Sequence, residues 1–174
     1  QRGLNKFSSS EGRFVNYFHN PRVTETLSDN NITAIVDQDQ DHLWVGTNQG
    51  GLNRFEKSSG KATRFLHKSE SSGGPLSNYI SHILVDATQT TWLGGDKGVS
   101  RIPARALEFA FYTPQDGSAT FTSAIAEDRE GSIWMGAWGI RRFNAVELES
   151  TAPNLRSERR FLKDFFILAI HSDR

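Results

Sequence analysis

The sequence predicts an all-β fold, a β-propeller fragment of four-stranded antiparallel blades. Three segments each hold a Trp followed two residues later by a Gly: Leu43–Thr47, Thr91–Gly95 and Ile133–Ala137. Their tryptophans are 48 and 42 residues apart, and each segment follows an Ile-containing run that ends in Asp, at Asp37, Asp86 and Asp128. A period of roughly 40–50 residues with several short strands per repeat is typical of propeller blades.

The repeat at residues 27–75 is the clearest and indicates four strands in order. The β-branched run at 32–36 is expected to be the innermost strand, and residues 43–47 the second. Glycines then turn the chain into a third strand at 52–55, and a polar loop precedes a fourth at 63–67.

Two further repeats, at 76–120 and 121–161, follow the same plan, although the outer strand of the second has no clear alternation. Partial repeats are expected at both ends. Residues 1–26 match a third and a fourth strand, and residues 162–174 a first strand. The chain is therefore interpreted as three nearly complete blades with partial blades at both ends, within one propeller fragment cut from a larger protein.

The repeated Trp and Gly have a packing explanation. One large aromatic per blade fills the widening gap between neighbouring blades, and the glycine after it lets the next blade approach closely. We expect Trp44, Trp92 and Trp134 in the core. Trp138 lies outside the repeated position and is expected to be exposed.

Composition disfavours several classes of function. Among 174 residues, 20 acidic and 20 basic side chains cancel, so the basic surface of a nucleic-acid-binding protein is missing. No apolar run is long enough to span or enter a membrane. The chain has no Cys, and its five histidines lack the short spacing of a metal site, so we expect no metal and no cofactor. No nucleophile motif is present, so the chain is not expected to be an enzyme.

The predicted binding face is the rim where loops leading into first strands meet the turns between second and third strands. Amides, charged groups and exposed aromatics there suit the hydroxyls and ring faces of a sugar. The candidates are Asn31, Asn48, Gln49, Asn78, Tyr79, Asp96, Lys97 and Trp138, with Asn30 and the loop at 114–120 on the same rim. For any single residue, solvation alone is the simpler explanation of a polar loop side chain, and both interpretations stay open.

The string Leu43-Trp44-Val45-Gly46-Thr47, followed by Gly50-Gly51-Leu52-Asn53-Arg54-Phe55, resembles the two-component regulator propeller repeat. The resemblance implies a periplasmic sensor region of a bacterial sensor or hybrid histidine kinase, or of a diguanylate cyclase. It implies an oligosaccharide, another small ligand or a protein as partner, together with the remainder of the parent sensor. A propeller-fold lyase or other carbohydrate-active enzyme is the alternative.

The two partial blades also predict self-association. Unpaired strand edges invite pairing with another chain. We therefore expect residues 165–170 of one copy to complete the partial blade at residues 3–19 of another. A compact ring of four units closing within one chain is the alternative.

Overall fold

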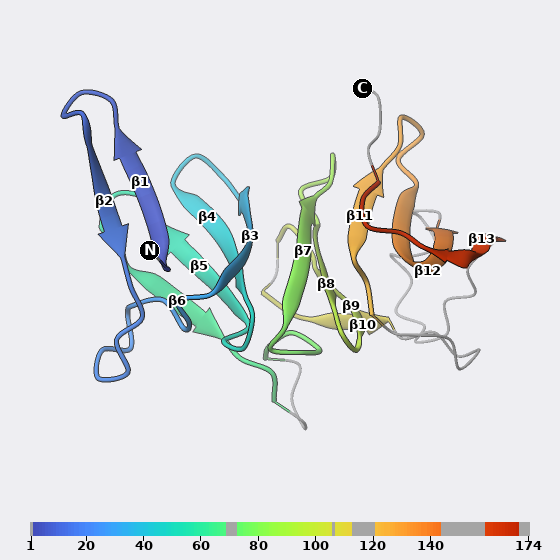
Figure 1. Ribbon diagram of the computed structural model, residues 1–174, viewed down its shortest axis with the longest axis horizontal. Helices are drawn as coiled ribbons and strands as arrows, with labels where there is room; N and C mark the ends of the chain where they lie inside the picture. The colour runs from blue at the N-terminus through green and yellow to red at the C-terminus, as the bar shows by residue number, and fades with distance from the viewer. Residues whose placement is uncertain (1, 69–72, 106, 113–120, 144–158, 171–174) are drawn as a thin grey trace.

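The computed structural model describes residues 2–68, 73–105, 107–112, 121–143 and 159–170. Within these ranges the secondary structure consists of β-strands, without a helix, and the strands of each sheet pair antiparallel. Four sheets stand side by side in chain order (Figure 1). The predicted all-β propeller architecture is confirmed.

The first sheet is a hairpin of β1 (Leu4–Ser8) and β2 (Arg13–Tyr17). The second sheet contains, in sequence order, β3 (Ile32–Asp37), β4 (His42–Thr47), β5 (Leu52–Glu56) and β6 (Ala62–Phe65). The third sheet contains, also in sequence order, β7 (Ile80–Val85), β8 (Thr91–Gly95), β9 (Gly98–Ile102) and β10 (Ala110–Tyr112). Trp44 pairs with Val36 and Arg54, and Trp92 with Leu84 and Arg101, so the two complete blades share one register.

The fourth sheet contains β11 (Ala124–Glu127), β12 (Ile133–Phe143) and β13 (Arg159–Phe166). An extended strand of 11 residues would cover about 35 Å. However, Nη2 of Arg142 lies 2.9 Å from Oγ of Ser132. β12 therefore folds back on itself, with Gly139 at φ +86° near the bend, and its two halves take the places of the second and third strands (Figure 1).

β13 is the outer strand that the sequence pattern left unassigned, and it crosses the boundary expected between residues 161 and 162. The place of the next inner strand begins at Ile167. The hydroxyl of Ser123 donates to the carbonyl of Ile167, just as Thr33 donates to the carbonyl of Ile80. The expected first strand of a further blade thus starts later than residue 162, because β13 already occupies residues 159–166.

Neighbouring blades meet through the inner strands β3, β7 and β11 and through the cores between the sheets (Figure 1). Trp44 and Trp92 are each 1% exposed, which confirms their predicted place in the core. Trp134 is half-buried, so the same prediction is only partly met in the third blade. A Cβ on Gly46 would lie 2.7 Å from Cγ2 of Ile80, and one on Gly136 would lie 2.8 Å from Cγ2 of Ile167. These close approaches confirm why the repeat keeps glycine after the Trp.

The predicted self-association stays a prediction. In the complete blades, a first strand pairs with a second strand and not with a third. The hairpin of β1 and β2 matches third and fourth strands, because Leu4 and Tyr17 pack in one cluster with Phe55 of the next blade. Residues 165–170 of another copy would therefore have to take the place of a second strand.

Candidate functional site

Two kinds of position make up the predicted rim. One is the residue before Ile32, Ile80, Thr122 or Ile167, and these residues are Asn31, Tyr79, Phe121 and Phe166; Ile32 and Ile80 begin β3 and β7, and Thr122 and Ile167 correspond to Ile80 because their carbonyls accept from the hydroxyl of the preceding inner strand. The other is the first residue after the second-strand segment, and these residues are Asn48, Asp96 and Trp138. Backbone bonds hold neighbouring blades together here: Thr122 N donates to Gly95 O at 2.8 Å, and Ile167 N to Ala137 O at 2.8 Å.

The first complete blade supplies the amide end of the rim. One Asp29 carboxylate oxygen accepts from Asn31 N at 3.0 Å, and the other from Gln49 N at 3.0 Å. Asn48 N donates to Asn31 O at 3.0 Å. These bonds use backbone groups of Asn31, Asn48 and Gln49, so they fix the two loops together without occupying the three side-chain amides.

Asn78 lies at the rim but also holds the connection between two blades. Its Oδ1 accepts from His67 N at 2.7 Å, and its carbonyl oxygen from Gly51 N at 2.8 Å. Asn30 makes the same pair of bonds one blade earlier, with His19 N and Gly3 N, each at 2.7 Å. A bond pattern that recurs between blades indicates a structural role for these Asn oxygens.

The other end of the rim is aromatic. Tyr79 stacks with Phe121, with ring centroids 6.0 Å apart and planes 23° apart, and Phe121 stacks with Phe166 at 6.0 Å and 24°. Trp138 meets Phe166 edge-on at 5.4 Å. These four residues form what we call the aromatic strip. Trp138 is 52% exposed, as predicted, and Phe166 is 41% exposed.

Sequence reasoning found Tyr79 and Trp138 but missed Phe121 and Phe166. Phe121 precedes Thr122-Ser123 as Tyr79 precedes Ile80-Ser81, so an alignment on the inner-strand hydroxyl would have found it. Phe166 was hidden because residues 165–170 read as one apolar strand. The structure assigns Phe166 to the end of β13.

Asp96 and Lys97 form an exposed turn between the two ends of the rim. Gly95, directly before them, pairs with Ile80, and a Cβ on Gly95 would lie 2.6 Å from Tyr79 O. The turn therefore lies beside Tyr79. The structure thus brings the predicted candidates onto one rim, whereas the loop at 114–120 lies outside the described residues.

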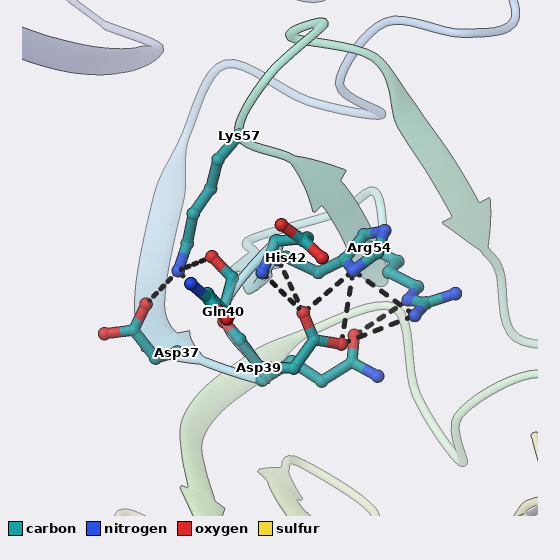
Figure 2. A network of polar contacts seen from close by, with 8 residues as sticks. Asp37, Asp39, Gln40, His42, Arg54 and Lys57 are labelled. Carbon is teal, nitrogen blue, oxygen red and sulfur yellow. Dashed lines mark hydrogen bonds and ion pairs between the residues drawn. The ribbon is translucent and has the colours of Figure 1, made fainter.

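A second polar cluster lies at the turn joining β3 and β4 (Figure 2). Lys57 Nζ donates to Asp37 at 2.6 Å, Nδ1 of His42 lies 2.9 Å from Asp39, and Nη2 of Arg54 lies 3.5 Å from Asp39. Burial opposes ionisation of Asp39, but the hydrogen bonds from His42 and from the backbone N–H groups of Asp41 and His42 outweigh it and lower its pKa. The charges of this cluster satisfy one another.

The backbone hydrogen bonds of the same turn show that the sequence alignment of Asp37 with Asp86 and Asp128 is wrong. Asp86 N donates to Thr90 O and Asp128 N to Ser132 O, whereas in the first blade Gln38 N donates to His42 O. Gln38 is therefore the true counterpart. Asp86 and Asp128 accept the indole N–H of Trp92 and Trp134 at 2.8 and 2.7 Å.

The first complete blade lacks that bond, and Nε1 of Trp44 is buried without a hydrogen-bond partner. We expect Gln38→Asp to raise the free energy of unfolding by about 1 kcal/mol, because it places a carboxylate six residues before the Trp, as in the other blades. Urea denaturation measures the gain, with Gln38→Ala, which offers no acceptor to the indole N–H, as the control. A Gln38→Asp chain that is no more stable than the unmodified chain would contradict the assignment.

Asp128 gives the fold a dependence on acid pH. Burial raises its pKa, but hydrogen bonds from Trp134 and Ser132 and the charge of Arg142 outweigh burial, and the pKa falls below its usual 3.8. A depressed folded-state pKa contributes stability above the unfolded-state pKa that is lost as pH falls through the folded value. Between about pH 5 and pH 3, Asp128→Asn should flatten the loss of unfolding free energy, whereas the exposed control Asp37→Asn should not. Parallel pH profiles for Asp128→Asn and the unmodified chain would refute this.

No group of three or more His, Asp or Glu in the described ranges is placed to hold a metal ion. In the same part of the chain, no helix has the length and apolarity needed to cross a membrane.

Comparison with known proteins supports the fold and one repeat. Residues 26–49 match the model of the two component regulator propeller. A comparison with curated protein sequences found no match.

The fold resembles three solved structures. One is the extracellular domain of BT3049, described as a hybrid two component system of B. thetaiotaomicron, with 23% identity, a TM-score of 0.69, and coverage of 83% of this chain and 20% of that one. The extracellular domain of BT4673 from the same organism has 17% identity and a TM-score of 0.63, and the match covers 92% of this chain and 29% of that one. Virginiamycin B lyase from Staphylococcus aureus has 15% identity and a TM-score of 0.59, and the match covers 82% of this chain and 45% of that one.

The chain thus spans less than a third of the two extracellular domains that it resembles, and at these identities the likeness concerns the fold. The predicted resemblance is confirmed at the repeat where the motif is clearest. Residues 26–49 match the two component regulator propeller repeat, within a chain whose fold resembles that of those extracellular domains.

Proposed function

We propose that this chain is part of the extracytoplasmic, ligand-sensing propeller of a bacterial transmembrane two-component protein, and that it is not itself catalytic. The observation that carries the proposal is the two component regulator propeller repeat at 26–49, which supplies the amide end of the rim. An oligosaccharide or another small ligand would bind at the rim, and the remainder of the parent protein would transmit the event. In a Gram-negative cell the location would be the periplasm.

The rim supports this proposal because it combines two kinds of recognition group. Backbone bonds from Asp29 position the amide residues Asn31 and Gln49, and the aromatic strip begins one blade later at Tyr79. Polar groups that converge beside apolar surface are typical of small-molecule sites.

A lyase is the second candidate, because the fold also resembles virginiamycin B lyase. The histidines in the described ranges favour sensing over catalysis. Nδ1 of His19 and of His67 bonds backbone carbonyls, at 2.6 and 3.0 Å, and His42 bonds Asp39. His82 is half-buried against β11, and burial lowers its pKa despite a hydrogen bond to the Ile125 backbone. None of these four lies among the named rim positions. Release of cleavage products from an oligosaccharide incubated with the chain would favour the lyase.

Location is tested by cysteine labelling, since this chain has no native Cys. Lys97→Cys places a thiol on an exposed rim turn, and Lys6→Cys on the exposed face of β1 is the matched control. In the native protein, expressed in its own cells, both thiols should react with a membrane-impermeant maleimide before lysis. Labelling that requires lysis would overturn the extracytoplasmic location.

A further inference from the structure

We propose that the aromatic strip (Tyr79, Phe121, Phe166 and Trp138) is the stacking surface for a neutral oligosaccharide, with the amide end of the rim binding its hydroxyls. The inference rests on the proposed ligand-binding function and specifies the site and ligand class. Two of the four rings belong to Phe121 and Phe166, whose side chains carry no hydrogen-bonding group.

The geometry leaves ring surface available. Tyr79, Phe121 and Phe166 are nearly parallel, but their centroids are 6.0 Å apart at each step, which places the rings in an offset row rather than a closed stack. The row passes over the starts of three consecutive inner-strand positions. It therefore suits a ligand made of several rings in a chain more than a single flat molecule.

Exposure distinguishes the strip from the repeated tryptophans of the core. The repeated Trp44 and Trp92 are each 1% exposed, whereas Trp138 and Phe166 remain 52% and 41% exposed although they contact each other. Exposed aromatic surface that is grouped rather than scattered marks an interaction site. A pyranose ring carries an apolar C–H face and a hydroxyl edge, so it can cover such a ring and still reach polar groups.

The charges of the rim favour a neutral ligand. The named rim positions bring together two carboxylates, Asp29 and Asp96, and the single amine of Lys97. Recognition of an acidic sugar or a nucleic acid strand requires cationic groups around the stacking surface. Amides such as Asn31 and Asn48 serve uncharged hydroxyls, since each offers both a donor and an acceptor.

Trp138 provides the probe, because Trp44 and Trp92 are buried and Trp134 is half-buried. The chain is titrated with neutral cello-, xylo- and malto-oligosaccharides while iodide quenching of Trp fluorescence is measured. The expected result is saturable protection from quenching by at least one of them. Trp138→Phe should abolish the optical signal but keep binding detectable by calorimetry.

Two variants locate the site. Phe166→Leu and Phe121→Leu should each weaken binding about three- to tenfold, which corresponds to the loss of one aromatic contact. Phe14→Leu is the matched control: Phe14 is 64% exposed and contacts one ring, Phe7, but lies on β2 away from the rim, so binding should not change. Circular dichroism confirms that each variant is folded.

Three results would overturn the inference: no neutral oligosaccharide protects Trp138, only oligogalacturonate or adenosine does so, or folded Phe121→Leu and Phe166→Leu bind as tightly as Phe14→Leu. In each of these cases the result of extracytoplasmic cysteine labelling would still stand, and a rise in melting temperature with another small ligand would still support sensing. Failure of the strip is therefore distinguishable from failure of the proposed function.

Discussion

Asp86→Ala is expected to lower the free energy of unfolding by about 3–4 kcal/mol, the largest loss from any single polar side chain described here. Asp86 is 4% exposed, and it accepts from Thr88 N, Thr90 N and Nε1 of Trp92 at 2.8–2.9 Å. Alanine would leave these donors without an acceptor, one of them in the core between two blades. Urea denaturation measures the loss.

Asp37→Ala is the matched control, because the sequence repeat aligns Asp37 with Asp86 while the structure does not. The Asp37 side chain is 77% exposed and pairs only with Lys57 at 2.6 Å among the salt bridges described. Its removal should cost less than about 1 kcal/mol. If Asp86→Ala does not fold, Asp86→Asn should show an intermediate loss. Equal losses at Asp37 and Asp86 would refute the assignment of Gln38 as the counterpart of Asp86.

The second large effect is expected at the contact between β4 and β7. Gly46→Ala should cost about 2 kcal/mol, because its Cβ would lie 2.7 and 3.0 Å from Cγ2 and Cβ of Ile80. Ile80→Ala alone should cost about 2–5 kcal/mol, since Ile80 is 1% exposed.

A double-mutant cycle provides the control for this contact. In Gly46→Ala/Ile80→Ala the smaller side chain makes room for the added methyl group, so the combined loss should be smaller than the sum by about 1 kcal/mol or more. Strictly additive losses would show that the two residues do not pack against each other as described.

The blade plan was predictable from the sequence because propeller repeats encode it locally. The Trp and Gly positions fix the second strand, the β-branched run fixes the first, and turn residues separate them. Both complete blades follow this plan with one register, at Trp44 and Trp92. The third blade was harder because β12 turns at Gly139 without a polar turn before it, and its outer strand lies beyond a long segment.

The rim was only half predictable. Polar loop residues such as Asn31 and Asp96 stand out by composition, but Asn78 turned out to bond the connection between blades. Phe121 and Phe166 escaped notice because an apolar residue beside a strand is normally part of a core. Only the arrangement of three blades in space shows that these rings line up with Tyr79.

The one-residue offset at Gln38 shows why spacing alone misled the alignment. Asp37 is seven residues before Trp44, whereas Asp86 and Asp128 are six before their tryptophans. The equivalent backbone hydrogen bonds of the turn are made by Gln38, Asp86 and Asp128, although Gln38 is not an acid. The carboxylate of Asp39 therefore binds the backbone of its turn and His42, and Trp44 keeps an unpaired indole N–H.

The measurement that tests the central claim most directly is the melting temperature of this chain across a panel of neutral oligosaccharides and small metabolites, with its mass in solution determined in parallel. A ligand that binds only the native state stabilises it by about 2.7 kcal/mol at 100 times its Kd. We predict a dose-dependent rise with a neutral oligosaccharide that is reduced in Phe166→Leu and retained in Phe14→Leu. A well-folded sample whose melting temperature does not change with any ligand would contradict direct sensing at the rim.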